Sequence, residues 1–303
     1  MKKIKLTAIL LTVLMLMLAG CGSTAPKNTV TSAFDYNTSE IAKPEIDLSN
    51  AEGVLKDVLD KGVLVVATAP DNPPYEYVAD DGKTLSGSEL FLAKYIADIL
   101  GVELQIETMD FGAVLTAVDT GKADLAMAGF GWKKDRAENF ELSIGYHSST
   151  AGSSCHCLMV RTEDLEKYDS FDDFDGQMVA AQAGSLHQMY VEDQMPNAVL
   201  ELVSGFDQAI LNLSTKKVEA LATSCSVARQ YAEQSGGTLS KSPLEFDLSM
   251  YGAYEGTVVG AKKGETSIID VMNQILTFVN ENAIYDGMYQ QALDETGMID
   301  GEE

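Results

Sequence analysis

Short apolar runs and amphipathic segments alternate along most of the chain. Residues 62–69 (GVLVVATA) form an apolar run bounded by turn residues, which predicts a buried strand. In residues 88–101 (SELFLAKYIADILG) apolar side chains recur every three or four positions up to Gly101, which predicts a helix that ends there. The next segments predict a strand, a short helix and another buried strand, at 102–109, 112–122 and 123–129.

The same order of elements returns after residue 157. Strands are predicted at 177–184, 198–203 and 218–224, with helices between them at 185–195 and 206–217. A helix at 51–62 opens this folded part, and a strand at 256–264 and a long helical tail at 267–297 close it. Alternating strands and helices indicate parallel sheets covered by helices, so the sequence predicts an α/β fold of two similar units in series.

The first 21 residues have the three parts of an export signal. A lysine-rich start precedes an apolar run from 6 to 18, and the stretch ends in LAGC at residues 18–21. The apolar run is shorter than the ~20 residues that a spanning helix needs. LAGC resembles a bacterial lipobox, which implies cleavage before Cys21 and a lipid on its thiol, so that the protein is anchored to the outer face of the cytoplasmic membrane. An ordinary cleaved signal is the alternative.

Residues 22–49 differ in composition from everything that follows. They are rich in Ser, Thr, Pro, Asn and Lys and show little apolar periodicity. Such a segment buries too little apolar surface to fold by itself. We therefore expect a signal peptide at 1–20 and a flexible tether at 21–50.

Composition limits the possible partners. The chain has 303 residues, of which 46% are apolar, and a formal net charge of −25 at pH 7. The roughly 250 residues after the tether suffice for two lobes of ordinary size. A basic nucleic-acid footprint is absent, so we expect no nucleic-acid partner. The charge favours solubility and mildly repels anionic surfaces.

Four cysteines raise the question of metal binding and disulfides. They are Cys21, Cys155, Cys157 and Cys225, and the pair in CHC flanks a histidine. Zinc sites usually show longer cysteine spacings and a second matched pair, which this sequence lacks. We therefore expect neither a metal nor a cofactor. If Cys21 carries a lipid, three cysteines remain, and one is left over after any single internal bridge.

The stretch AGFGWKKDRAENFELSIGY, residues 128–146, contains the most distinctive candidate for ligand chemistry. Arg136 follows a glycine-bearing turn at the carboxyl end of a predicted strand. A guanidinium grips a carboxylate with two hydrogen bonds, and glycines let the backbone of Gly129 and Gly131 approach a ligand closely. The alternative is an exposed pair of Arg136 with Glu138 or Glu141, which contributes little to stability.

The chain resembles the extracytoplasmic solute-binding proteins of polar-amino-acid ABC transporters, solute-binding protein family 3. The resemblance covers residues 51–298 and rests on the order of several marks. These marks are KGVLVVATAPDNPPYEYVADDGKTLSGSELFLAKYIADILG, MDFGAVLTAVDTGKADLAMAG, KKDRAENFELSIGY, GQMVAAQAGS and GTVVGAKKG. It implies a type II periplasmic-binding-protein fold, with residues 51–150 and 253–298 in one lobe and 151–252 in the other. Two crossing segments, near 147–157 and 249–256, would join the lobes around one ligand cleft.

The resemblance also implies site residues. Arg136 stands where the family binds a ligand carboxylate, and Phe111 where it often places an aromatic platform. Phe130 flanks the same turn as Arg136, Tyr75 lies in the first strand–helix loop, and Asn72 takes the place of another aromatic platform.

Two departures from the family pattern concern the second lobe. Its first loop usually offers two hydroxyls, whereas this chain has Ser185 followed by Leu186. Its third strand commonly ends in an aspartate that holds the ligand ammonium, whereas this chain has Ser224. A serine is a poor counter-ion for a desolvated ammonium, so a carboxylated solute is better supported than a standard α-amino acid. Glu76 or backbone carbonyls are alternative partners for an amine.

The strand order of the family suggests a disulfide. The strand that begins with SSCHCLMV would lie beside the strand that ends at Ser224, which brings Cys155 or Cys157 within reach of Cys225. Buried free thiols are the alternative.

Together these features predict a monomeric binding protein that captures a small carboxylated solute, an amino acid or a derivative. It would deliver the solute by cleft closure to an ABC permease and its ATPase. A ligand-sensing module for a membrane receptor is one alternative. A cleft enzyme of dehydratase type, with Glu76 or Glu89 as general acid, is the other. We expect no enzyme, because the sequence has no Ser-His-Asp arrangement, HExxH helix or phosphate loop.

Overall fold

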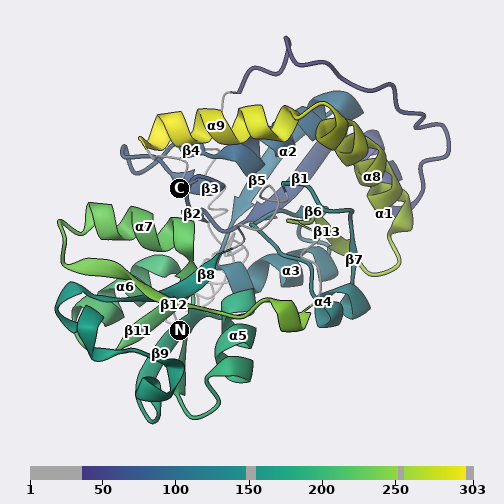
Figure 1. Cartoon of the computed structure of the whole chain (residues 1–303). Coiled ribbons are helices and arrows are strands. Elements are labelled where there is room, and N and C mark those ends of the chain that lie inside the picture. Colours follow the sequence, from purple (N-terminus) through teal and green to yellow (C-terminus); the bar gives the residue numbers. More distant parts are fainter. Residues whose placement is uncertain (1–35, 148–154, 252–255, 298–303) are drawn as a thin grey trace, which may run out of the picture. The chain divides into compact units, whose positions relative to one another are not determined.

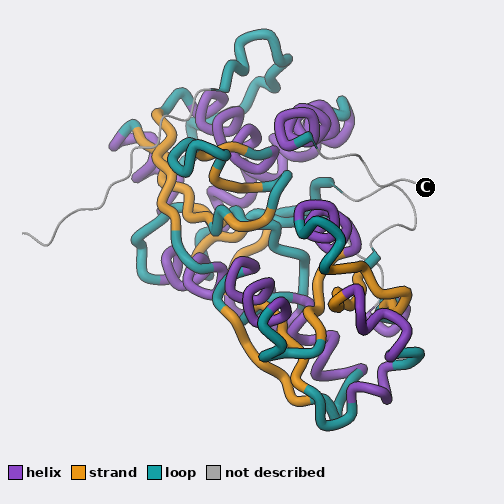
Figure 2. The backbone as a smooth tube through the Cα atoms, turned by 90° about the vertical axis from the view of Figure 1, so that its left-hand side faces the viewer, coloured by secondary structure: helices purple, strands orange, loops and turns teal. Residues whose placement is uncertain are grey.

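The computed structural model describes residues 36–147, 155–251 and 256–297 (Figure 1). Two five-stranded sheets carry the fold, and Figure 2 shows helices flanking the strands. The α/β organisation in two successive units is therefore as predicted. We call the sheet that contains residues 63–142 and 260–262, with its helices, the first lobe, and the sheet that contains residues 156–245 the second lobe.

The first sheet has the strand order β5-β1-β6-β13-β7. Its strands are β1 (Val63–Thr68), β5 (Glu103–Thr108), β6 (Leu125–Ala126), β7 (Phe140–Leu142) and β13 (Gly260–Lys262). β1 runs parallel to β5 and β6, whereas β13 runs antiparallel to β6 and β7. The chain therefore returns to its first sheet after the whole second lobe has been made.

Helices cover both faces of this sheet. They are α1 (Gly53–Lys61), α2 (Ser88–Leu100), α3 (Phe111–Asp119), α4 (Lys134–Asn139), α8 (Thr266–Glu281) and α9 (Ile284–Thr296). Figure 1 shows α8 and α9 beside α1 and α2, and one apolar core joins these four helices to β1. A second core lies under α3. A small sheet of β2 (Asp71–Asn72), β3 (Glu76–Val78) and β4 (Leu85–Ser86) fills the connection between β1 and α2.

The second sheet has the strand order β10-β9-β11-β8-β12. Its strands are β8 (His156–Arg161), β9 (Met178–Gln182), β10 (Val199–Val203), β11 (Ala220–Ser224) and β12 (Leu239–Glu245). β9 is parallel to β10 and β11, and β8 is antiparallel to β11 and β12. Its helices are α5 (Leu186–Gln194), α6 (Phe206–Ser214) and α7 (Cys225–Gln234), with short 3-10 helices at Thr162–Lys167, Phe171–Phe174 and Ser249–Tyr251.

Several predicted elements need correction. The strand predicted at 123–129 is only two residues long as β6, although Ala123 and Met127 beside it are buried. The long helical tail is two helices, because Ala283 adopts a left-handed conformation with φ of 50° and ends the hydrogen-bonding pattern of α8. The strand predicted at 256–264 is confined to Gly260–Lys262.

The tether prediction is wrong for residues 36–50. They contain no helix or strand, yet Tyr36 stacks on Phe91 with ring centroids 4.2 Å apart. Tyr95 donates a hydrogen bond of 2.6 Å to the carbonyl of Ala42. The polar composition of the segment did not predict these contacts with α2. A few such contacts are enough to hold a segment that has no regular secondary structure. Residues 1–35, with the predicted signal peptide and Cys21, lie outside the described residues.

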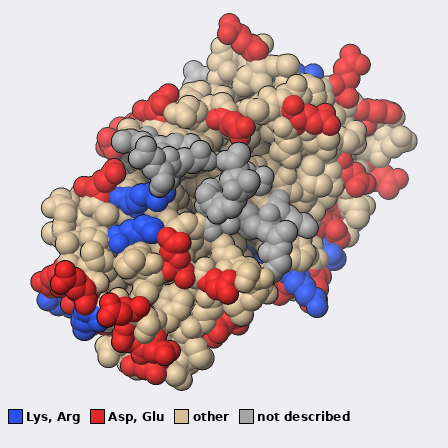
Figure 3. All heavy atoms as spheres, viewed as in Figure 1, with Lys and Arg blue, Asp and Glu red and all other residues tan. Residues whose placement is uncertain are grey.

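The predicted lobe boundaries near 150 and 252 also fall outside the described residues, as do residues 148–154 and 252–255 of the two predicted crossing segments. Within the described ranges, no helix has the length and apolar character needed to cross a bilayer. Acidic side chains are spread over the face seen in Figure 3, as the net charge of −25 leads one to expect.

Candidate ligand-binding site

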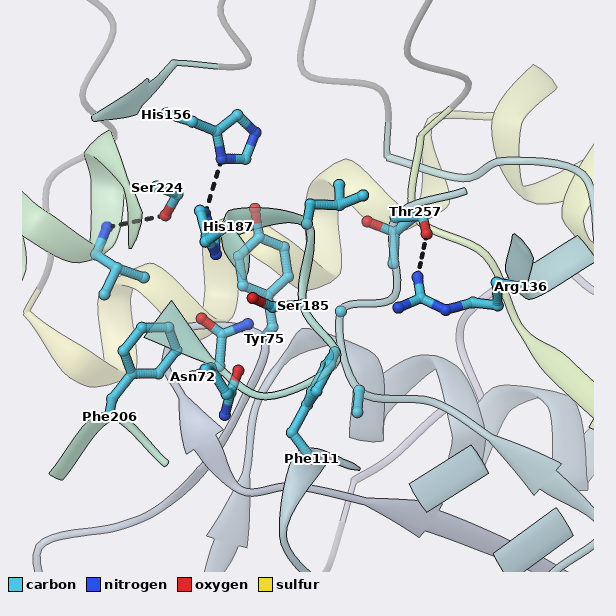
Figure 4. Close-up of a pocket in the computed structure, with 16 residues that line it drawn as sticks. Asn72, Tyr75, Phe111, Arg136, His156, Ser185, His187, Phe206, Ser224 and Thr257 are labelled. Atoms are coloured by element: carbon cyan, nitrogen blue, oxygen red, sulfur yellow. Dashed lines mark hydrogen bonds between the residues drawn. The ribbon is translucent and has the colours of Figure 1, made fainter. Parts of the chain in front are cut away.

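One pocket is lined by residues of both lobes (Figure 4). Eight of the nine predicted ligand-binding residues line it: Asn72, Tyr75, Phe111, Gly129, Gly131, Arg136, Ser185 and Ser224. The other lining residues, which were not predicted as ligand contacts, are Ala128, His156, Gln182, Leu186, His187, Phe206, Val227 and Thr257.

Strand direction explains why these residues meet. Phe111, Leu186 and Phe206 are the first residues of helices that follow parallel strands, and Ser224 ends a parallel strand. Ligands in such sheets bind outside the carboxyl ends of the strands. His156 arrives at the same edge from the opposite direction, because it starts the antiparallel strand β8 and pairs in register with Ser224. Helix starts also place positive dipole ends around the pocket, which favours an anionic ligand group.

Arg136 is buried at this pocket, with a relative exposure of 3%. Its Nη1 donates to the carbonyl of Gly131, and its Nη2 donates over 3.0 Å to the carbonyl of Gly184 in the second lobe. Its Cζ lies 4.8 Å from the centre of the Phe130 ring. The guanidinium therefore stands at the contact between the lobes and packs on an aromatic face.

The exposed ion pairs considered for Arg136 are not what the structure contains. Glu138 lies 3.9 Å from Lys134, and Glu141 lies 3.3 Å from Lys263. These acids have lysine partners at the surface, whereas Arg136 is directed into the protein.

Phe130 is the predicted residue that does not line the pocket. It is 1% exposed, and its ring centroid is 4.7 Å from that of Phe111. It thus packs beneath Phe111 and Arg136 and supports both, because the tight turn from Gly129 to Gly131 points its side chain into the core. Trp132, on the other side of Gly131, is 39% exposed.

Asp71 joins the two lobes beside the pocket. Its Oδ2 accepts 3.0 Å from Nε2 of Gln182 and 3.1 Å from the backbone N–H of Phe206, both in the second lobe. Burial raises the pKa of Asp71 to about 6, against the lowering effect of the Phe206 hydrogen bond. Gly205 permits this approach, because a Cβ there would lie 2.7 Å from Oδ2 of Asp71.

Two buried carboxyls lie behind the pocket wall of the first lobe. Glu89 accepts 3.0 Å from the backbone N–H of Gly129 and 2.8 Å from the hydroxyl of Tyr146. Glu76 accepts 3.3 Å from Nδ2 of Asn72. Burial raises the pKa of Glu89 to about 7, and burial together with the nearby Glu89 raises the pKa of Glu76 well above its usual range.

This arrangement corrects two expectations about the first lobe. The N–H of Gly129 is directed at Glu89, so it is not available to a ligand carboxylate. Glu76 and Glu89 are not among the lining residues, so they hold Asn72 and Gly129 in place rather than facing the pocket. The sequence did not indicate that Glu76 and Glu89 lie close together, because they are 13 positions apart, on β3 and α2.

The two predicted serines of the second lobe serve as helix caps. The hydroxyl of Ser185 accepts from the N–H of Gln188 at 3.2 Å, at the start of α5. The hydroxyl of Ser224 accepts from the N–H of Val227 at 3.3 Å, at the start of α7. Their oxygens line the pocket, but part of their hydrogen-bonding capacity is used by the backbone.

His156 and His187 form a contact that the sequence did not reveal. Nδ1 of His156 and Nε2 of His187 are 2.9 Å apart. Burial lowers the pKa of His156 to about 4, and burial with the neighbouring His156 lowers that of His187 well below its usual range. The sequence shows both histidines, His156 in the CHC stretch and His187 after the QAG loop. Nothing in the sequence predicts that they are in contact.

A disulfide joins Cys155 to Cys225, with Cα atoms 5.3 Å apart. The structure thus selects one of the two pairings that the family resemblance left open. Cys157 is a buried free thiol, and burial raises its pKa to about 12. Cys155, Cys225 and Glu245 have potential ligand atoms within 4.8 Å, but disulfide sulfurs are not thiolates that bind a metal.

Known proteins resemble this chain in sequence and in fold. A family model described as bacterial extracellular solute-binding proteins, family 3, matches residues 64–295. The L-cystine-binding protein TcyJ of Escherichia coli is 20% identical over 225 residues, which are 74% of this chain and 80% of TcyJ.

Solved structures of other proteins are also similar to this chain. The amino acid ABC transporter substrate-binding protein AbpA of Streptococcus pneumoniae, bound to L-arginine, is 30% identical and has a TM-score of 0.71 over 80% of this chain and 98% of its own. ArgBP of T. maritima, in its P235GK form, is 23% identical, has a TM-score of 0.69 over 80% of this chain and all of its own, and bears on the fold alone. The chain therefore belongs to family 3 of the bacterial extracellular solute-binding proteins and has their type II two-lobe fold.

Proposed function

We propose that the protein captures a small carboxylated solute, an amino acid or a derivative, between its two lobes. The single observation that carries this proposal is the buried guanidinium of Arg136, which lines a pocket shared by both lobes. A planar guanidinium offers a carboxylate two parallel hydrogen bonds. Phe111 and Tyr75 supply aromatic surface for the rest of the solute.

Closure of the lobes couples binding to transport. Asp71 and Arg136 both contact backbone groups of the second lobe, so the closed arrangement gains hydrogen bonds of its own. A ligand that contacts both lobes adds to these and shifts the population toward the closed state. In this proposal a membrane permease with an ATPase recognises that state, as the relatives that are named after ABC transporters suggest.

A comparison of ligand affinities in Arg136 variants tests the proposal. Titration calorimetry and thermal shift would use the twenty amino acids, L-citrulline and L-ornithine as ligands. We expect Arg136→Lys to lose at least tenfold in affinity for any amino acid that binds, because lysine keeps the charge but not the fork. Arg136→Ala should lose more.

Arg229→Lys provides the matched control, since Arg229 does not line the pocket. The Arg229→Lys variant should bind the same amino acids with the same affinity as the wild type. If Arg136→Ala binds as tightly as the wild type, Arg136 is not the carboxylate clamp. If no amino acid binds the wild type, the proposed solute class is wrong.

We further propose a lipid on Cys21 that keeps the protein on the outer face of the membrane. The support is the LAGC stretch after an apolar run. Cells that express Cys21→Ala should release the protein or retain its uncleaved precursor, whereas the wild type should fractionate with membranes and gain the mass of the lipid. Equal fractionation and an unmodified Cys21 in the wild type would contradict the proposal.

We infer binding rather than catalysis at this site. A cleft enzyme of the type considered needs a carboxyl group in contact with the substrate. The two acids considered for that role accept hydrogen bonds from Gly129 and Asn72 behind the wall, which supports a structural role.

A further inference from the structure

The pair of His156 and His187 is the least expected feature of the second-lobe side of the pocket. In Figure 4 the two rings lie together beside Ser224, and Arg136 lies toward the other end of the drawn residues. Both rings pack against Tyr190, at centroid distances of 5.2 and 6.1 Å. This packing fixes the ring planes, and the 2.9 Å contact fixes which nitrogens face each other.

Proton counting defines what such a pair can offer a ligand. A neutral imidazole has one N–H donor and one acceptor nitrogen. If His156 donates to Nε2 of His187, then Nδ1 of His187 carries a proton and is a donor. If His187 donates instead, its Nδ1 is an acceptor. Nδ1 of His187 can therefore donate a hydrogen bond to a ligand or accept one from it, and the pair stays uncharged in both cases.

That nitrogen has no hydrogen-bond partner within the described part of the chain, although it is buried. A buried polar atom without a partner is unfavourable and is rare in native proteins. Because His187 lines the pocket, a ligand group is the natural partner for its Nδ1.

Charge separates the candidate ligands. Among the described lining residues Arg136 is the one with a permanent charge, and none is a carboxylate. The neighbouring acids are engaged elsewhere: Asp71 with Gln182 and Phe206, and Glu76 and Glu89 with Asn72 and Gly129. Burial favours the uncharged form of all three acids. The α-ammonium of an amino acid already has no facing carboxylate among these residues. A second cation, at the end of the side chain, would be desolvated as well and would share the pocket with a guanidinium.

From this geometry we infer that the solute is an amino acid or derivative whose side chain ends in an uncharged hydrogen-bonding group. Nδ1 of His187 makes the bond that selects it. The inference rests on the proposed function and narrows it, because it excludes basic amino acids as the preferred ligands. The chain would then differ in specificity from the relative whose structure contains L-arginine.

L-citrulline and L-arginine are a suitable pair of probes, since they have the same length and nearly the same shape but differ in charge. Titration calorimetry on the wild-type protein should show that the uncharged polar amino acid that binds most tightly has at least tenfold higher affinity than any of the basic amino acids. The same experiment should show that L-citrulline binds more tightly than L-arginine. L-glutamine, L-asparagine and L-threonine test shorter uncharged groups, L-lysine and L-ornithine test other cations, and L-leucine tests a side chain without a polar end.

Variants of His187 test the bond itself. His187→Leu removes the nitrogen and should lower the affinity for the preferred probe at least tenfold. His187→Asn places an amide near the position of Nδ1 and should stay within about threefold of the wild type. Gln290→Asn is the control, because Gln290 is exposed on α9 and is not a lining residue.

The outcomes separate the two proposals. Tighter binding of a basic amino acid or of L-leucine than of every uncharged polar probe overturns this inference and leaves the carboxylate site intact. Equal affinities of His187→Leu and the wild type for the preferred probe overturn the role of Nδ1. If none of the twenty amino acids, L-citrulline or L-ornithine binds the wild type, the proposed function is overturned as well. The comparison of wild-type affinities remains decisive even if a variant fails to fold.

Discussion

The two lobes bury titratable groups at the same pocket, and burial acts on them in opposite directions. In the first lobe it raises the pKa of the carboxyls of Asp71, Glu76 and Glu89. In the second lobe it lowers the pKa of the two histidines. Both shifts favour the uncharged form, because a charge loses its hydration when it is buried. A guanidinium is different, since it stays protonated in proteins, and so Arg136 keeps its charge where the other groups tend to lose theirs.

The lobes also hold their pocket residues by different means. In the first lobe, hydrogen bonds to Glu89 fix the turn at Gly129. In the second, the Cys155–Cys225 disulfide ties the start of β8, which carries His156, to the start of α7, which follows Ser224. The first arrangement depends on pH and the second on redox conditions. The two can therefore be perturbed separately.

Removal of the disulfide should give the largest effect. The bridge links residues 70 positions apart, and a disulfide that closes a long loop typically contributes about 2–4 kcal/mol to the free energy of unfolding. The double variant Cys155→Ser, Cys225→Ser should lose that amount in urea denaturation without reductant. The wild type should lose a similar amount when reductant is added.

Cys157→Ala is the control for this experiment, because Cys157 is outside the bridge. It should still respond to reductant as the wild type does. A wild-type protein whose Cys155 and Cys225 react with a thiol reagent after denaturation without reductant would rule out the bridge.

The opposite pKa shifts predict opposite pH dependences, of intermediate size. Glu89, with its raised pKa, contributes stability that is present below about pH 4.5 and is lost as the pH rises through about 7. His156, with its lowered pKa, contributes stability that is present above about pH 6.5 and is lost as the pH falls through about 4. Relative to the wild type, Glu89→Gln should gain about 1–2 kcal/mol in unfolding free energy from pH 5 to pH 7. His156→Gln should gain a similar amount from pH 7 to pH 5.

Urea denaturation of the three proteins at pH 5, 6 and 7 measures both slopes. Gln274→Asn supplies a control, because Gln274 is exposed and neither side chain titrates, so this variant should run parallel to the wild type. Slopes of the same sign for Glu89→Gln and His156→Gln would contradict the contrast between the two lobes.

Sequence periodicity predicted the strands, and the resemblance to the family indicated which of the residues after them belong to the ligand site. Phe111, Arg136, Ser185 and Ser224 all come at or after the carboxyl end of a predicted parallel strand, where side chains of neighbouring strands converge. This is why half of the residues that line the pocket could be predicted without a structure.

The remaining features depend on pairing that a single sequence does not encode. The register of β8 against β11 sets His156 opposite Ser224 and Cys157 opposite Thr223, which leaves Cys155 opposite Cys225. A shift of one residue would exchange those neighbours. β2 and β4 have two residues each, too few to show a period, so neither the small sheet nor the contact of Asp71 with the second lobe was predicted.

The contact between the lobes at Asp71 should give the smallest effect, and it can be tested from both sides. Asp71→Ala removes the acceptor for Gln182 and for the N–H of Phe206, so the closed state loses two hydrogen bonds. We expect roughly a tenfold loss of ligand affinity, or ~1.4 kcal/mol, mostly through faster ligand release. Stopped-flow release of a bound amino acid measures it.

Gly205→Ala should weaken binding in the same way in a protein that keeps Asp71. Its backbone is extended, with φ of −154°, so alanine fits there locally, and the obstacle is the carboxylate that would lie 2.7 Å from the new Cβ. Once Asp71 is alanine, that obstacle is gone, and the second substitution should have little further effect. Gly112→Ala is the matched control, because its Cβ would lie at an ordinary 3.6 Å from the carbonyl of Ala183 in the second lobe. A Gly205→Ala effect that is equally large with and without Asp71 would mean that the glycine serves α6 alone and that Asp71 does not join the lobes.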